Sequence, residues 1–108
     1  MDEKFLRELR EIIDKNFTNP DFNVDRLAKK LYISRAALYK KVHALTGETP
    51  NQIILSTRLE RGAQLLRDNY GNVTEVAMAV GFSSSTYFAT CFKEKFHQSP
   101  LSYQASGA

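Results

Sequence analysis

The sequence contains little of what secreted, membrane-spanning, metal-binding and catalytic proteins require. Its 108 residues include one cysteine, which excludes an internal disulfide, and two histidines, so no Cys/His cluster has zinc-site spacing. No run of about 18 apolar residues occurs and no signal-peptide pattern follows Met1, so we expect a cytoplasmic protein with no membrane span. No phosphate loop, paired carboxylates or nucleophile–base arrangement is recognisable. We therefore expect no enzyme, no metal ion and no cofactor, and we interpret Cys91 as a partly buried structural thiol.

Charge is unevenly distributed along the chain. Residues 1–25 hold four basic and seven acidic residues, a balance of −3, whereas residues 26–108 hold eleven basic and five acidic ones, a balance of +6. Within 26–50 only Glu48 is acidic, and the basic residues there are Arg26, Lys29, Lys30, Arg35, Lys40 and Lys41. A basic cluster on exposed helix positions suits a polyanionic partner, although an ordinary solvated face is the alternative.

The segment from Val73 to Pro100 has the pattern of a helix-turn-helix. Val76, Ala77 and Val80 give a first short helix one apolar face, and Gly81 marks a tight turn. Apolar residues then recur every four positions in a second helix that ends at 98–100: Phe88, Phe92 and Phe96. The second helix of such a motif can lie in the DNA major groove.

The segment from Val24 to Pro50 repeats this plan. Asn23 corresponds to Asn72, 49 positions later, and after the turn the offset becomes 50, so that Leu38 corresponds to Phe88. Two helix-turn-helix patterns in register within a small chain are much stronger evidence than one. In the first copy the turn has Tyr32 where the second has Gly81. If the position needs a positive φ, Tyr32 would hold it at a cost of about 1 kcal/mol, and this turn would be expected to differ from its counterpart.

Three further helices complete the prediction of an all-α protein of about seven helices. An amphipathic helix over 3–16 packs against the first repeat, a long linker helix covers 49–68, and a last turn covers 101–104. Leu101 and Tyr103 of this last turn are expected to cover the core of the second repeat. The linker spans roughly 28 Å, which suits two helix-turn-helix units reading successive groove segments. On it, Arg58 and Arg61 fit either buried ion pairs or phosphate contacts. The expected division is 1–48, 49–68 and 69–108.

Over roughly residues 20–104 the sequence resembles the DNA-binding domain of the AraC/XylS family of bacterial transcription regulators. The most specific match is GFSSSTYFATCFKEKFHQSP, and ALTGETPNQIILSTRLERGAQLL also matches. The resemblance implies two helix-turn-helix subdomains joined by a long helix and bound to adjacent major-groove segments of duplex DNA. His97 departs from the family pattern, which usually has glycine there, so this helix must either be strained at its end or end differently.

Carried over by position, the resemblance also implies the residues that contact DNA. The base-contacting residues would be Arg35, Ala36, Tyr39 and Lys40 in the first recognition helix and Ser85, Thr86, Ala89 and Thr90 in the second. Contacts with the DNA backbone are assigned to Ser34, Lys41, His43, Ser84 and Lys93. Because bidentate base contacts normally come from Arg, Asn or Gln, the first helix is expected to supply most of the affinity and the second mainly positioning.

The leading functional hypothesis is sequence-specific DNA binding as the output module of a larger regulator, with similarity to hybrid two-component regulators. A sensor or receiver domain would then lie elsewhere in the full-length protein, RNA polymerase is a further candidate partner, and the isolated domain is expected to be a monomer. The alternative is a helical protein-interaction module that binds an acidic partner. Salt dependence and site preference distinguish the two.

Overall fold

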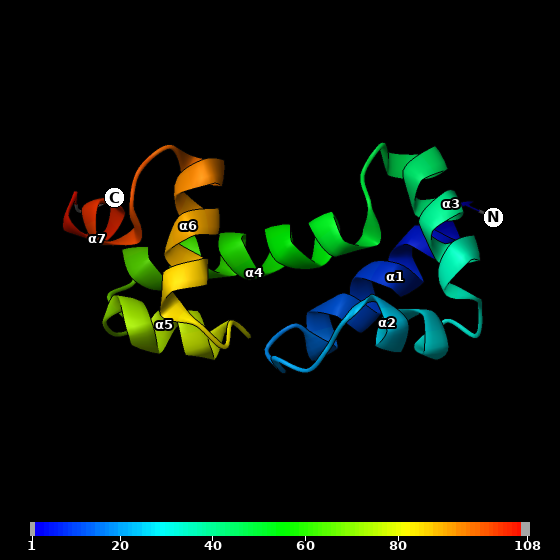
Figure 1. Ribbon diagram of the computed structural model, residues 1–108, viewed down its shortest axis with the longest axis horizontal. Coiled ribbons are helices and arrows are strands. Elements are labelled where there is room, and N and C mark those ends of the chain that lie inside the picture. The colour runs from blue at the N-terminus through cyan, green and yellow to red at the C-terminus, as the bar shows by residue number, and fades with distance from the viewer. Residues whose placement is uncertain (1, 107–108) are drawn as a thin grey trace. The chain divides into compact units, whose positions relative to one another are not determined.

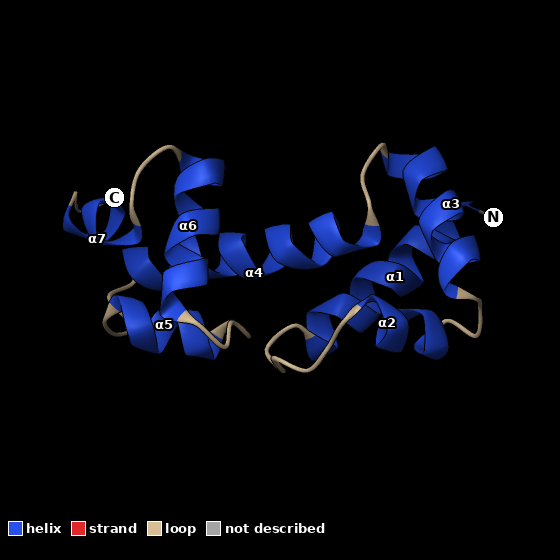
Figure 2. Cartoon of the chain, viewed as in Figure 1, coloured by secondary structure: helices blue, strands red, loops and turns tan. Residues whose placement is uncertain are grey.

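The computed structural model describes residues 2–106, which form seven α-helices and contain no strand (Figures 1 and 2). The all-α prediction, with two helix-turn-helix units and a long linker helix, is confirmed. The helices are α1 (Asp2–Asn16), α2 (Val24–Lys30), α3 (Arg35–Thr46), α4 (Pro50–Arg67), α5 (Val73–Ala79), α6 (Ser85–Phe96) and α7 (Pro100–Ala105). Across the described part of the chain, none of these helices is long and apolar enough to cross a membrane.

The chain forms two compact units, and α4 contributes to both. One unit contains the residues up to Phe17 together with Asp21–Thr57, and the other contains Thr18–Pro20 and the chain from Arg58 onwards. The sequence-based division placed the whole of α4 in a separate linker, whereas each unit uses one part of this helix.

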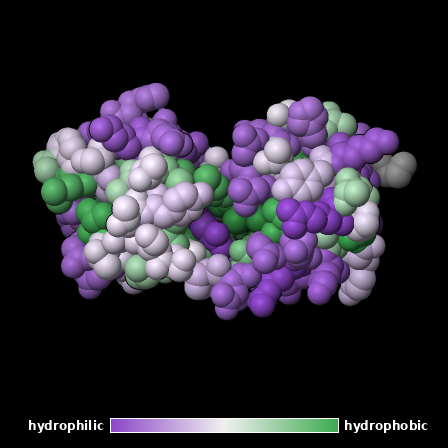
Figure 3. All heavy atoms as spheres, in the orientation of Figure 1, coloured by the Kyte–Doolittle hydropathy of each residue, from purple (hydrophilic) through white to green (hydrophobic). Residues whose placement is uncertain are grey.

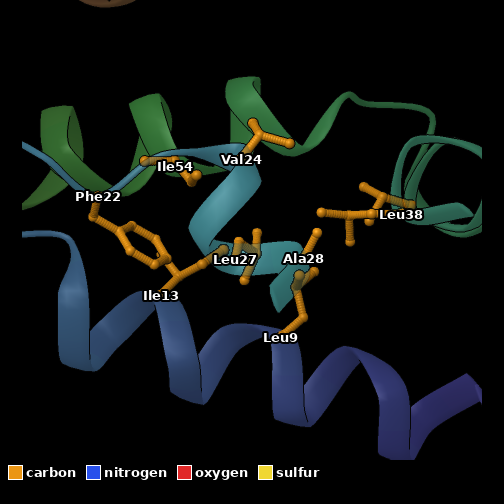
Figure 4. Close-up of a cluster of buried hydrophobic side chains, with 9 residues drawn as sticks. Leu9, Ile13, Phe22, Val24, Leu27, Ala28, Leu38 and Ile54 are labelled. Carbon is orange, nitrogen blue, oxygen red and sulfur yellow. The ribbon is translucent and has the colours of Figure 1, made fainter. Parts of the chain in front are cut away.

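The core of the first unit lies between α1, α2, α3 and the start of α4 (Figure 4). Leu9 and Ile13 of α1 point toward α2, where Leu27 is also buried, as expected from the apolar spacing of the first helix. All three are at most 1% exposed, so their side chains contribute fully to the burial that stabilises this unit. The remaining buried members are Phe22, Val24, Ala28, Leu38, Val42 and Ile54.

The core of the second unit is aromatic. Phe88 packs edge-on against Phe82, with ring centroids 5.1 Å apart, and Phe92 lies 5.3 Å from Tyr103 of α7. Tyr103 therefore covers this core as expected. Leu101 does not: it is 68% exposed, because a helix as short as α7 presents one face to the core and Leu101 lies on another.

The two helix-turn-helix units share their turn geometry, so the expectation that the Tyr32 turn differs from its counterpart is wrong. Tyr32 donates its N–H to Lys29 O and Ile33 donates to Ala28 O, and the same bonds join Gly81 to Met78 O and Phe82 to Ala77 O. The φ of Tyr32 is 59° and that of Gly81 is 97°. Tyr32 thus adopts the left-handed region that favours glycine, at a cost of about 1 kcal/mol.

The ends of α3 and α6 are also equivalent. Gly47 ends α3 with φ 76° and donates its N–H to His43 O, and His97 ends α6 with φ 63° and donates to Lys93 O. Of the two alternatives for His97, the structure therefore has the strained one, with the helix end unchanged. The caps that begin these helices match as well, since Ser34 and Ser84 each accept a backbone N–H, from Ala37 and Tyr87.

Candidate nucleic-acid interface

In α3 the buried residues determine which side chains are presented to solvent. Leu38 and Val42 are fully buried, so the opposite side of the helix faces outward. Three of the residues predicted to contact DNA lie on that side and are exposed: Ala36, Lys40 and His43. Two further residues of this face are exposed but were not predicted from the sequence: Ala37 and Ala44. Their helical spacing from Leu38 and Val42 was sufficient to predict that they are exposed. Alanine, however, offers DNA only a methyl contact.

Tyr39 lies on the side of α3 that faces the core of the first unit. It is half-buried and packs against the core cluster, so only part of its side chain is available to a ligand. Arg35 lies beside it, with its guanidinium carbon 5.5 Å from the Tyr39 ring centroid. Both residues were predicted to contact bases, and the structure places them together rather than at the centre of the exposed face.

Arg35 forms an ion pair with Asp25 of α2. Its Nη1 donates to Asp25 Oδ1 at a distance of 2.8 Å, and both side chains are 57% exposed. The hydrogen bond and charge of Asp25, followed by those of Tyr39, raise the pKa of Arg35 above its ordinary value. Asp25 precedes the basic cluster in sequence, so the sequence alone gave no signal that it reaches α3.

Lys41, predicted to contact the DNA backbone, lies at the edge of the exposed face of α3 that is next to α1. Its ammonium nitrogen is 4.5 Å from the centroid of the Phe5 ring, a cation–π contact. Lys41 and Phe5 also line an open hollow of about 300 Å³, together with Lys4, Glu8, Leu31 and Ile33. Lys41 remains exposed, but it does not share the outward direction of Lys40.

In α6, Phe88, Cys91 and Phe92 are buried, which agrees with the interpretation of Cys91 as a structural thiol. Thr86, Thr90 and Lys93 are exposed as predicted, whereas Ser85 and Ala89 are partly covered. The Thr90 hydroxyl donates to Thr86 O at 3.1 Å. Its proton is thus engaged within the helix, and its oxygen lone pairs remain able to accept a hydrogen bond.

Two larger side chains of α6 were missed by the sequence analysis. Tyr87 is 55% exposed, and Glu94 is exposed one turn further along the helix from Thr90. These two side chains make the exposed side of α6 bulkier than the predicted contact residues alone. A hydrogen bond with Cys91 is the main cause that raises the pKa of Tyr87, and Glu94 adds to it. An acidic residue on this face repels phosphates but can accept from the amino group of cytosine.

The electrostatic character of the two helix-turn-helix units differs. The six basic residues of the first unit's cluster are all exposed, on α2 and α3: Arg26, Lys29, Lys30, Arg35, Lys40 and Lys41. In α6 two lysines, Lys93 and Lys95, flank Glu94. The surface over α3 and α6 is mostly hydrophilic to neutral on the face shown in Figure 3. The first unit therefore presents the stronger attraction for a polyanion.

Two of the three arginines of α4, Arg58 and Arg61, have partners in the second unit. Nη2 of Arg58 donates to the main-chain oxygen of Asn19 at 3.0 Å, and burial lowers the pKa of this half-buried arginine. Arg61 is exposed, and its Nη1 donates to Gln64 Oε1 at 3.1 Å. Arg58 thus ties the loop before α2 to α4, which is neither of the two roles considered from the sequence.

A family model and several known proteins are similar in sequence to this chain. A family model described as a helix-turn-helix domain matches residues 27–106. The chain is 39% identical over 104 residues to histidine kinase P4 of Formosa agariphila, covering 96% of this chain and 8% of that protein. It is 33% identical over 106 residues to the transcriptional regulator MtrA of Neisseria gonorrhoeae, covering 98% of this chain and 35% of that protein. The chain thus spans a small part of each relative.

Solved structures with the same fold include domains of transcription regulators. The C-terminal domain of the two-component response regulator yesN from Fusobacterium nucleatum has a TM-score of 0.87 at 28% identity, over 96% of this chain and 99% of that one. The DNA-binding domain of AdpA, determined in complex with a target DNA, has a TM-score of 0.87 at 29% identity, over 94% and 90% of the two chains. The chain therefore belongs to the helix-turn-helix family of AraC/XylS-type DNA-binding domains.

Proposed function

We propose that this chain binds duplex DNA at specific sequences, with α3 and α6 each lying in a major-groove segment. The observation that carries the proposal is the exposed basic cluster of α2 and α3, beside an outward face of α3 that bears Lys40 and His43. Lysine and arginine neutralise phosphates and also donate to guanine edges. Support also comes from AdpA, whose DNA-binding domain of similar fold was determined with a target DNA.

Within this proposal the two recognition helices have unequal roles. Lys40 and Arg35 of α3 supply the long donors that bond guanine O6 and N7. In α6, Thr86 and Thr90 supply short hydrogen-bonding groups and methyl contacts, with Ser85 and Ala89 at the edge of the contact. Backbone contacts are assigned to Ser34, Lys41, His43, Ser84 and Lys93. The two serines also cap their helices, so each lies at a helix N-terminus, where phosphates bind favourably.

In this proposal the two recognition helices contact adjacent major-groove segments. We expect the two contacted segments to lie about one helical turn apart, roughly 10–10.5 base pairs.

The chain acts, in this proposal, as the output module of a longer regulator. It spans 35% of MtrA and 8% of histidine kinase P4, so a sensing or receiver part would occupy the remaining length of a protein of that kind. Signal-dependent binding then requires the longer protein, whereas basal DNA recognition requires this chain alone.

A binding titration at several salt concentrations tests the proposal. Duplexes selected by the protein from a random pool are compared with unselected duplexes and with a polyanion that has no bases, such as heparin. We expect tight binding to selected duplexes, with an affinity that falls steeply with salt because several phosphates are contacted. Equal binding to all duplexes and to heparin would contradict sequence-specific recognition and favour an acidic protein partner instead.

A further inference from the structure

Arg35, the first residue of α3, is held on two sides. Asp25 of α2 accepts a hydrogen bond from its Nη1 at 2.8 Å, and the Tyr39 ring lies 5.5 Å from the guanidinium carbon. A long side chain at the start of an exposed helix would otherwise sample many rotamers. The ion pair and the ring together restrict the guanidinium to the side of α3 that faces α2.

Stabilisation of the fold does not explain this arrangement. Both Asp25 and Arg35 are 57% exposed, and exposed ion pairs of this kind contribute little or nothing measurable to folding. Asp25 also places a negative charge beside the basic cluster of α2 and α3, which weakens the general attraction of that cluster for a polyanion. Its presence is therefore unfavourable for non-specific binding.

The geometry of the guanidinium indicates what the arrangement does. The guanidinium group of arginine is planar and has two edges that can each form a pair of parallel hydrogen bonds. The ion pair with Asp25 engages Nη1, so Asp25 does not occupy the other edge, which is formed by Nε and Nη2. That edge fits the O6 and N7 acceptors of guanine in a bidentate pair. A side chain already held in one orientation also loses less conformational freedom when it binds.

The carboxylate further distinguishes between two possible ligands of Arg35. A phosphate that approaches Arg35 also approaches the charge of Asp25 and is repelled by it. A guanine edge presents uncharged acceptors, so it incurs less of this repulsion.

We propose that Asp25 is a positioning residue that directs Arg35 toward a guanine edge and away from phosphates, so that the pair raises sequence discrimination at the expense of non-specific affinity. The inference rests on the proposed function, because it requires α3 to lie in a major groove. The second helix-turn-helix has no counterpart of this pair, since Thr74 and Ser85 occupy the equivalent positions. Discrimination by a positioned arginine is therefore confined to the first unit.

The test compares wild type with Asp25→Asn, Arg35→Lys and the double variant. Asp14→Asn is the matched control, because it removes the same charge from an exposed position on α1. Affinities are measured by fluorescence anisotropy for a selected duplex, for duplexes in which each G·C pair is replaced in turn, and for random duplex, each at several salt concentrations. Thermal unfolding of each variant shows whether folding is affected.

For Asp25→Asn we expect random duplex to bind more tightly, with a salt slope steeper by about 1, because Arg35 gains access to a phosphate. At one G·C position the preference for guanine should fall by about five-fold or more. Arg35→Lys should lose the same preference, and Asp25→Asn should reduce it no further in the double variant. Asp14→Asn should leave that preference unchanged.

The outcomes separate this inference from the function on which it rests. If wild type does not distinguish selected from random duplex, the proposed function fails. If wild type distinguishes them and Asp25→Asn retains every base preference, the positioning role alone is wrong. A loss of affinity that is equal for selected and random duplexes would also contradict it, since that result indicates a purely structural role for Asp25.

Discussion

A Cβ atom placed on Gly62 of α4 would lie 2.9 Å from Cε1 of Phe88, a fully buried phenylalanine of α6. This distance is shorter than real Cβ contacts allow, so the aromatic ring lies directly on the helix backbone. Phe88 in turn packs against Phe82 and Phe92. The absence of a side chain at Gly62 therefore allows the second unit to place α6 against α4.

Gly62→Ala should accordingly destabilise the protein, although alanine is the better helix former by about 1 kcal/mol. Overpacking a filled core costs about 1–3 kcal/mol, so we expect a net loss of roughly 1 kcal/mol in the free energy of unfolding. Denaturant unfolding measures it, with Glu60→Ala on the exposed side of α4 as the control. A gain in stability for Gly62→Ala would show that Phe88 moves aside without cost.

The left-handed residues that end α3 and α6 allow a reciprocal test of backbone strain. His97→Gly should stabilise the protein by about 1 kcal/mol, because φ is 63° at this position. Gly47→Ala should destabilise it by a similar amount, since φ is 76° there and an added Cβ meets nothing within 4 Å. Thermal unfolding of both variants measures the effect. Changes of the same sign in the two variants would contradict the equivalence of these helix ends.

The strained turn of the first unit gives a related prediction. Tyr32 has φ 59° and is 93% exposed, so its side chain contributes no packing that offsets the strain. Tyr32→Gly should raise the free energy of unfolding by about 1 kcal/mol, and Tyr32→Ala, which keeps a Cβ, should raise it by much less. If the two variants were equally stable, the strain would not reside in the backbone of this residue.

The unequal roles proposed for the two recognition helices predict different losses on truncation. Lys40→Ala should weaken binding to a selected duplex by about 1–3 kcal/mol, because it removes a long donor from the exposed face of α3. Thr90→Ala should cost less, since the Thr90 hydroxyl already donates to Thr86 O within α6. Binding titrations of the two variants against the same duplex measure the difference. A larger loss for Thr90→Ala would contradict the unequal division.

Much of the fold could be predicted from the sequence, because local signals coincide with the helix boundaries. Asparagine, serine and threonine at the helix starts, with apolar residues at helical spacing, placed most of the described helix ends within one or two residues. The positive φ of Tyr32 was anticipated, but the expected difference between its turn and the Gly81 turn was wrong for a physical reason. The main-chain hydrogen bonds to Lys29 and Ala28 set its conformation, and the strain of a non-glycine residue is too small to change them.

The candidate site was harder to predict than the fold. Helical spacing identifies the residues opposite a core, and it correctly placed Lys40 and Thr90 on exposed faces. It does not show what lies beside a helix. Lys41 packs on Phe5 and Arg35 pairs with Asp25 because α1 and α2 flank α3, and these contacts depend on tertiary packing.

Hydroxyl-radical footprinting on a selected duplex tests the central claim, that two recognition helices contact adjacent groove segments, most directly. We expect two protected segments with centres about 10–10.5 base pairs apart. Lys40→Ala should weaken protection of one segment, and Thr90→Ala should weaken protection of the other. A single protected segment that responds to both substitutions, or no protection at any concentration, would contradict the account.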